Sequence, residues 1–278
     1  MTVWFITGAS RGFGLEITKV ALERGDSVVA TARNPQSVID ALPDAGARLL
    51  AVELDVHRPA QITAAVDAAI AKFGRIDVLI NNAGRGLLGA VEEASDAAAR
   101  AVYDTNVFGT LNVLRAVLPT MRDQRGGRII NLSSIGGFTG SAGWGIYNST
   151  KFAVEGFSEA LAKEVAPLGI LVTIVEPGYF RTDFLDGSSL HTEATVIADY
   201  AETAGAMRRK AGGLNHEQPG DPVRAVEAIM TIAESVEPPL RIQLGSDAFA
   251  SVADKLAAVG AEQRRWRDLA VSTDFADT

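Results

Sequence analysis

An apolar run followed at once by three closely spaced glycines opens the sequence, and it restricts the possible fold more than any other feature. Val3 to Thr7 suits a buried parallel strand, and Gly8, Gly12 and Gly14 lead into an amphipathic stretch over residues 15–22. Glycine lets the backbone turn tightly and approach a pyrophosphate, which the unpaired N–H groups of a helix N-terminus attract. The order predicts a strand, a phosphate-binding turn and a helix. Its spacing is G-x-x-x-G-x-G rather than the more common G-x-G-x-x-G.

Apolar runs and amphipathic stretches continue to alternate along the chain. This alternation predicts an α/β fold, a doubly wound parallel sheet with helices on both faces. No linker or repeat divides the 278 residues, and their 47% hydrophobic content is enough for a sizeable core, so we expect one domain over residues 1–278. Beyond the first strand, we expect strands at 27–32, 48–54, 77–80, 128–134, 170–176 and 240–244.

Charge and composition exclude several classes of function. With 26 basic and 34 acidic residues the formal charge is −8, and no basic run exceeds residues 208–210, which argues against nucleic acid and anionic membrane as partners. The absence of cysteine excludes disulfides and thiol catalysis and fits a cytoplasmic protein. Strand-like sequence from Val3 leaves no room for a signal peptide, and no apolar run is long enough to span a membrane. His57, His191 and His216 lack metal-ligand spacing, so we predict no metal site and assign all three to surface or loop positions.

A serine, a tyrosine and a lysine between residues 134 and 151 form the strongest candidate for chemistry. Ser134 follows the predicted strand, whereas Tyr147 and Lys151 share one face of a helix that Pro167 and Gly169 terminate. A free tyrosine is mostly protonated at neutral pH, and a nearby ammonium would favour its phenolate. The serine could hydrogen-bond a reacting oxygen and stabilise its developing charge.

Five motifs occur in a fixed order and together resemble the classical short-chain dehydrogenase/reductase family. They are TGASRGFG, NNAG at 81–84, Ser134, the Tyr147-Asn-Ser-Thr-Lys151 segment, and Pro177-Gly178, with twelve residues between the serine and the tyrosine. The resemblance covers roughly the first 245 residues and is strongest to hydroxysteroid- and retinol-dehydrogenase-like bacterial members. It implies a Rossmann-like sheet and a nicotinamide dinucleotide. It also implies a homodimer or homotetramer built on the long helices after strands four and five.

The end of the second predicted strand decides which nicotinamide dinucleotide we expect. An NAD-preferring site usually carries an acidic residue there, but the sequence has Ala32 and then Arg33, with no acid between Asp26 and Asp40. Arg33 and Arg11 could clamp a 2′-phosphate through charge-assisted hydrogen bonds, or either could be a solvated surface charge. The resemblance therefore implies NADP(H).

The resemblance also assigns roles to individual residues. Asp55 would bind the adenine amino group, with Val56 at the ring edge, although Asp55 is an equally good turn residue before the helix at Pro59. Asn106, an unfavourable residue within a helix, would hold a water that connects Lys151 to solvent. The catalytic set is Ser134, Tyr147, Lys151 and Asn106. The cofactor-binding set is Gly8, Ser10, Arg11, Gly12, Phe13, Gly14, Arg33, Asp55, Val56, Asn82, Ala83, Gly84, Tyr147, Lys151, Pro177, Gly178, Phe180 and Thr182.

Two later segments complete the predicted organisation. Residues 183–220 form a loose pattern that we expect to cover the substrate as a lid. Residues 246–278 form a helical extension of two stretches, with Trp266 near the end of the second, which could shield the pocket or build an oligomer contact. Apolar side chains expected to line the pocket are Phe184, Leu185, Leu190, Val196, Ile197, Tyr200, Met207, Trp144, Leu87 and Leu88, and they favour a lipophilic substrate.

The sequence therefore predicts an NADP(H)-dependent oxidoreductase that interconverts a ketone or aldehyde and an alcohol, with Tyr147 as the acid or base. An alternative is a regulatory protein that senses NADP(H) without turnover, which loss of the tyrosine or lysine would favour. Epimerisation or dehydration at the same site would be expected with a different glycine spacing and a longer chain. A serine hydrolase is disfavoured because Ser134 lacks a G-x-S-x-G elbow and a histidine partner.

Overall fold

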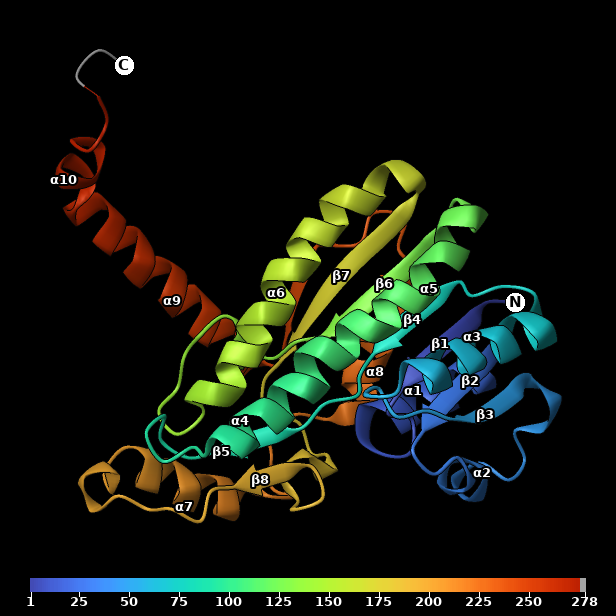
Figure 1. Ribbon diagram of the computed structural model, residues 1–278, viewed down its shortest axis with the longest axis horizontal. Coiled ribbons are helices and arrows are strands. Elements are labelled where there is room, and N and C mark those ends of the chain that lie inside the picture. The colour runs from blue at the N-terminus through green and yellow to red at the C-terminus, as the bar shows by residue number, and fades with distance from the viewer. Residues whose placement is uncertain (276–278) are drawn as a thin grey trace.

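Seven parallel strands form the central sheet of the computed structural model, which describes residues 1–275 (Figure 1). Their order is β3-β2-β1-β4-β6-β7-β9, so the chain winds outward in both directions from β1 and β4, as the sequence predicts. Every expected strand is present with bounds close to the predicted ones. The strands are β1 (Val3–Thr7), β2 (Ser27–Ala32), β3 (Leu49–Glu53), β4 (Val78–Asn81), β6 (Gly127–Leu132), β7 (Ile170–Pro177) and β9 (Arg241–Leu244).

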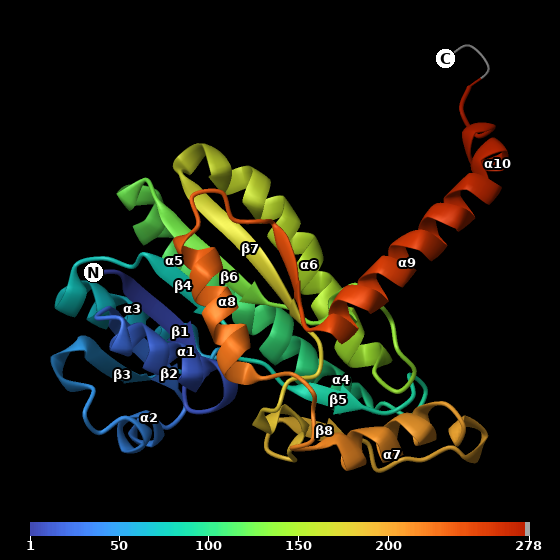
Figure 2. The same ribbon diagram turned by 180° about the vertical axis from the view of Figure 1, so that it is seen from behind.

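Helices cover both faces of this sheet because alternate strand residues point to opposite sides. In β1, Trp4 and Ile6 join a core cluster with α1 (Gly12–Glu23), α2 (Gln36–Ala41) and α8 (Pro222–Glu234). Phe5 joins the opposite cluster, which contains residues of the remaining sheet-covering helices. Figure 2 shows α1 and α8 on the near face. The opposite face carries α3 (Pro59–Phe73), α5 (Thr110–Gln124) and α6 (Gly145–Val165).

The helix that precedes β6 is interrupted where the sequence analysis expected a disturbance. Ser95 caps α4 (Asp96–Tyr103) by accepting a hydrogen bond from the Ala98 N–H at 3.2 Å. The backbone then widens into a π-helical segment over Asp104–Gly109 before α5 begins. Asn106 lies in this segment and is 1% exposed. π-bulges of this kind occur frequently at functional sites.

A second, two-stranded sheet connects the predicted covering segment to the body. The strands β5 (Gly86–Leu88) and β8 (Leu190–Thr192) pair in parallel, and the sequence analysis did not predict either. The segment continues through α7 (Ala204–Leu214). Short 3₁₀ turns lie at Gly46–Arg48, Ile135–Gly137, Ala166–Leu168, Asp183–Leu185 and Ala198–Tyr200.

A buried carboxylate fastens the covering segment in place. Glu93 is 3% exposed and accepts hydrogen bonds from the N–H groups of Ala90 and Ile197, at 2.6 and 2.8 Å, and from the Arg208 guanidinium. Burial raises the pKa of Glu93, but these hydrogen bonds outweigh it and hold that pKa below its usual range. The segment is therefore attached by an ionised carboxylate.

The C-terminal extension leaves the body of the molecule as two helices, α9 (Ser246–Arg265) and α10 (Arg267–Val271). Both views show it projecting away from the sheet and its covering helices (Figures 1 and 2). Trp266 lies at the junction of α9 and α10, so its predicted position near the end of the second stretch is wrong. Within residues 1–275, no helix is long and apolar enough to cross a membrane.

Candidate active site

A cavity of about 510 Å³ lies at the carboxyl edge of the central sheet, where α/β sheets of this order bind ligands. The loops after β1, β2, β3, β4, β6 and β7 all contribute to it. Two of the predicted site residues, Gly14 and Asn106, do not line this cavity. The predicted residues that do are Gly8, Ser10, Arg11, Gly12, Phe13, Arg33, Asp55, Val56, Asn82, Ala83, Gly84, Ser134, Tyr147, Lys151, Pro177, Gly178, Phe180 and Thr182.

The glycine turn has the geometry that a phosphate cradle needs. Gly8 and Gly12 have φ values of +67° and +53°, which L side chains rarely adopt. Gly14 has a different reason to be glycine, because a Cβ there would lie 2.3 Å from the Gly8 carbonyl oxygen. No side chain caps the N-terminus of α1, which leaves its first-turn N–H groups available for an anion. A dinucleotide pyrophosphate therefore fits the residues present.

Asn82 ties the glycine turn to the loop after β4, as the sequence analysis expected of an asparagine there. Its Nδ2 donates to the carbonyl oxygens of Thr7 and Gly8, at 2.9 and 3.0 Å. The Thr7 hydroxyl accepts in turn from the N–H groups of Asn82 and Ala83, both at 3.0 Å. These bonds fix the spacing between the two loops that a dinucleotide would cross.

The loop after β3 brings His57 to the edge of the cavity, and this histidine is exposed and lies in a loop, as predicted. Asp55 and Val56 line the cavity as predicted, and His57 lines it as well. The His57 Nδ1 lies 2.9 Å from Asp55 Oδ1, and its Nε2 lies 3.1 Å from the Thr105 hydroxyl. The one available signal was its position two residues after Asp55. Because the pairing orients Asp55, both proposed roles of this aspartate, as turn residue and as adenine ligand, remain compatible with the structure.

Ser134, Tyr147 and Lys151 meet in the cavity from two elements. Ser134 ends the loop after β6, where its hydroxyl accepts from the Gly136 N–H at 3.0 Å. Tyr147 and Lys151 lie one turn apart on α6, and the lysine Nζ is 5.9 Å from the tyrosine ring centre. Lys151 donates to the Leu132 carbonyl oxygen at 2.7 Å. The three side chains thus line one cavity, as the sequence predicts.

The electrostatics of this trio differ from the expectation that Lys151 lowers the pKa of Tyr147. Burial raises the pKa of Tyr147 well above its ordinary value, and a hydrogen bond with Ser134 opposes that rise only partly. Burial lowers the pKa of Lys151 to about 8, against the opposing influence of the Glu155 carboxylate. The phenol is therefore protonated at neutral pH in this structure, the form that can donate a proton.

Asn106 lies behind the cavity, and its side-chain amide forms hydrogen bonds with a neighbouring loop and with α6. Its Oδ1 accepts from the Arg85 N–H at 2.9 Å, and its Nδ2 donates to the Arg85 carbonyl oxygen and the Thr150 hydroxyl at 2.9 and 3.0 Å. A Cβ added to Gly84 would lie 3.3 Å from Asn106 Oδ1 and 3.9 Å from Lys151 Nζ, so Gly84 separates the two side chains. The water-holding role of Asn106 stays a prediction.

The two arginines proposed as a phosphate clamp have different surroundings. Arg33 is exposed at the end of β2 and lines the cavity. Arg11 instead reaches the covering segment, where it donates to the Ser188 carbonyl oxygen and the Ser189 hydroxyl, both at 2.9 Å. Asp26 does not belong to this site. Its carboxylate lies at the opposite end of the strands, where it accepts hydrogen bonds from the Thr2 N–H and the Trp4 Nε1–H.

The covering segment supplies an apolar wall, but from fewer residues than predicted. Of the ten expected wall residues, Trp144, Phe184 and Leu185 line the cavity. Leu87, Leu88 and Leu190 are buried in the core cluster that also contains Trp144, Met207 packs against that cluster, and Val196 is 65% exposed. The Tyr147 ring lies between Trp144 and Phe184, at centroid distances of 5.5 and 5.6 Å.

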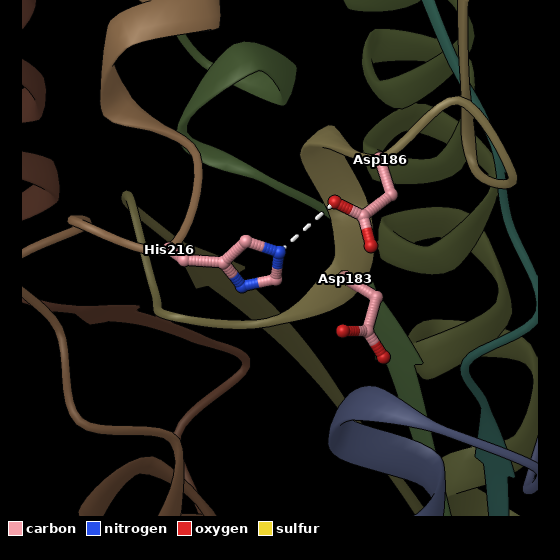
Figure 3. Close-up of side chains that lie close together, drawn as sticks. All are labelled: Asp183, Asp186 and His216. Atoms are coloured by element: carbon pink, nitrogen blue, oxygen red, sulfur yellow. Dashed lines mark ion pairs between the residues drawn. The ribbon is translucent and has the colours of Figure 1, made fainter.

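Both ends of the covering segment meet beside the cavity, where three ionisable side chains cluster (Figure 3). Asp183, Asp186 and His216 each place one potential ligand atom within 4.8 Å of the others. His216 Nε2 lies 3.2 Å from Asp186 Oδ1, which also accepts from Asn215 Nδ2 at 2.6 Å. His216 occupies a loop, as predicted, and its pairing with Asp186 closes the segment at its base.

Comparison with known proteins identifies the family. The family model described as short chain dehydrogenase matches residues 2–193. The chain is 40% identical over 272 residues to oxidoreductase BOA17 of Botryotinia fuckeliana, covering 98% of both chains. It is also 40% identical over 242 residues to a 3-ketodihydrosphingosine reductase of Bacteroides thetaiotaomicron, covering 86% of each. The chain belongs to the short-chain dehydrogenase family and is an oxidoreductase.

Solved structures support the same fold and a nicotinamide cofactor. A short-chain dehydrogenase from Streptomyces avermitilis superposes with a TM-score of 0.92 at 40% identity, covering 99% of both chains. A Burkholderia phymatum relative in complex with NAD has a TM-score of 0.83 at 26% identity, covering 94% of this chain and 95% of its own. The closed form of serine dehydrogenase complexed with NADP⁺ has a TM-score of 0.74 at 28% identity, covering 87% of this chain and 94% of its own. Because one of these relatives is in complex with NAD and another with NADP⁺, the comparison supports a nicotinamide cofactor of either type.

Proposed function

We propose that this protein is an NADPH-dependent reductase of lipophilic ketones. The observation that carries the proposal is the convergence of Ser134, Tyr147 and Lys151 in one cavity with the glycine turn. The bound nicotinamide would supply the hydride, and the chain's own residues would position the cofactor and deliver the proton.

The proton is the chain's contribution to reduction. A protonated Tyr147 is the form that a carbonyl oxygen needs as hydride reaches its carbon, and burial keeps the phenol protonated. The Ser134 hydroxyl orients the carbonyl and stabilises the charge that develops on its oxygen. Lys151 Nζ, close to the tyrosine ring, stabilises negative charge on the phenol oxygen after transfer.

The cavity wall supports a lipophilic substrate. Trp144, Phe184 and Leu185 face the same space as the Tyr147 phenol. A 40% identical relative is named as a reductase of 3-ketodihydrosphingosine, a long-chain ketone, which agrees with this wall. A panel of ketones of increasing chain length, assayed with saturating NADPH, tests the class. Activity confined to charged sugar-nucleotide substrates would contradict it.

The preference for NADPH rests on Arg33. It is an exposed cation at the end of β2, where the sequence has no carboxylate to bind a ribose hydroxyl. We expect Arg33→Ala to weaken NADPH binding by about tenfold to a hundredfold and to leave NADH binding nearly unchanged, because a hydrogen bond to a charged group contributes about 1.5–3 kcal/mol. Fluorescence titration of the wild type and of Arg33→Ala with each dinucleotide measures these affinities.

Two further variants make that titration specific. Arg115→Ala removes an exposed arginine on α5, outside the cavity, and should change neither affinity. Arg11→Ala removes the contacts with Ser188 and Ser189 and is expected to weaken both dinucleotides, since it also loosens the covering segment. Equal NADPH and NADH affinities in the wild type would refute the Arg33 clamp and leave the oxidoreductase assignment intact.

A further inference from the structure

The arm formed by α9 and α10 is attached to the body only near its root. Ala248 and Val252 are the buried residues of α9. Asp247 Oδ2 accepts from the Tyr179 N–H at 2.9 Å, and the Ser251 hydroxyl lies 3.4 Å from that of Thr139. Beyond these contacts the arm extends into open space in both views (Figures 1 and 2).

A heptad pattern runs along α9, the longer helix of this arm. Starting at Phe249, apolar side chains recur at alternating three- and four-residue steps, with one polar interruption at Gln263. Leu256, Val259 and Trp266 are 57%, 45% and 56% exposed. Alternation of these two steps is the pattern of a and d positions in coiled coils, whereas a helix that packs on its own body has a broader apolar face. On α9 and at its C-terminal Trp266, the positions are Phe249, Val252, Leu256, Val259, Gln263 and Trp266, of which Val252 is buried at the root of the arm.

We call this line of a and d positions the seam. The residues that flank the seam suit a second helix of the same sequence. With Phe249 at position a, Lys255 and Glu262 occupy g positions. An antiparallel pair places g opposite g, so Lys255 of one copy faces Glu262 of the other. The antiparallel orientation therefore joins opposite charges.

Small residues complete the match. The e positions of α9 carry Ala253 and Gly260, which let two helix backbones approach closely. An isolated helix of this length is marginal in water, and tertiary packing normally supplies its stability. For the exposed part of α9, a partner helix with the same spacing would supply that packing.

We propose that the α9–α10 arm is a self-association surface, and that its partner is the same arm of a second copy of this chain. The contact is isologous, since the same seam serves both copies. It differs from the helix faces after strands four and five, on which the family resemblance places subunit contacts. Because Asp247 and Ser251 hold the root against the loops around Tyr179 and Thr139, pairing of the arms also braces loops next to the active site from outside.

The oligomeric mass of the full-length protein tests this surface. Leu256→Glu combined with Val259→Glu places two charges in the seam, and Ala261→Glu places one on the opposite, exposed side of α9. Sedimentation velocity should give the wild type and Ala261→Glu the same assembly, a multiple of the 29.3 kDa chain, and should give the double variant half that mass. Unchanged thermal unfolding and NADPH binding would show that the double variant is folded.

Tryptophan fluorescence provides a second readout that does not depend on mass. Trp4 and Trp144 are buried, so acrylamide quenching reports mainly on Trp266. Quenching should increase in the double variant and stay at the wild-type level in Ala261→Glu. A monomeric wild type, or a double variant with the wild-type mass and quenching, would overturn the proposal. The second result would leave another protein, or the body of the same chain, as the partner of the arm.

Discussion

Replacing Tyr147 by phenylalanine is expected to lower kcat for ketone reduction by about two to four orders of magnitude, the usual contribution of a positioned general acid. NADPH affinity should stay within a few fold of the wild type. The variant keeps the aromatic contacts with Trp144 and Phe184, so its fold and cavity wall should persist. Steady-state rates and a fluorescence titration on the same preparation separate the two effects.

The pH profile of the wild type follows from the same electrostatics. Burial raises the pKa of Tyr147, so the phenol holds its proton across the neutral range. Burial also lowers the pKa of Lys151 to about 8, so this ammonium is charged below that pH and loses its charge above it. We therefore expect kcat/KM for reduction to fall as the pH rises through about 8.

Tyr103→Phe is the matched control for the loss of a phenol. Its hydroxyl bonds Ser149 at 2.9 Å and does not line the cavity, so turnover should persist. Full activity in Tyr147→Phe would mean that another group donates the proton. A wild type that binds NADPH but reduces no ketone in the panel would favour the alternative of a regulatory sensor.

The fold could be predicted from the sequence because its signals are local. Each strand of the central sheet is an apolar run bounded by a turn, and each main helix shows its own periodicity. The strands β5 and β8 lacked such a signal, since each has three residues and is defined only by a partner about a hundred positions away. The interruption at Asn106 was expected, but its π-helical form depends on packing that the sequence does not display.

The site was predictable wherever a motif fixed a residue's backbone position. The glycine turn and the Ser134, Tyr147 and Lys151 trio are of this kind. The place of His57 in the cavity was not predicted, because its contact with Thr105, 48 residues further along the chain, is made only by the fold. The pKa of Tyr147 was predicted in the wrong direction because the burial of its side chain, invisible in the sequence, raises that pKa more than the hydrogen bond with Ser134 lowers it.

A buried group of carboxylates behind the active site supports the second large prediction. Glu155 and Glu176 are 6% and 0% exposed. Arg241 Nε lies 2.9 Å from Glu155 and 3.8 Å from Glu176, and the guanidinium also bonds the Glu159 carboxylate at 2.6 Å. Burial raises the pKa of Glu176 to about 7, with the Glu155 charge adding to the rise and Gln243 and Arg241 opposing it.

Arg241→Met is therefore expected to lower the free energy of unfolding by about 3–5 kcal/mol at pH 8, the usual cost of leaving buried charge without its partner. The loss should be smaller at pH 5. Between the ordinary carboxyl pKa and about 7 the unfolded chain ionises Glu176 while the folded chain still protonates it, so stability from this group falls as the pH rises. Arg241 lowers the pKa values of Glu155 and Glu176 in the folded protein, so removing it raises both values further and makes the loss of stability with rising pH larger. Urea unfolding at both pH values measures it.

Two companion variants separate charge from packing. Lys163→Met removes an exposed cation 3.4 Å from Glu159, at the edge of the same group, and should cost less than about 1 kcal/mol at either pH. Glu176→Gln keeps the shape of the side chain but removes its titration, so its unfolding free energy should change less between pH 5 and pH 8 than that of the wild type. If Arg241→Met loses the same stability at both pH values, the arginine acts through packing of its side chain, and the buried carboxylates are not the source of its effect.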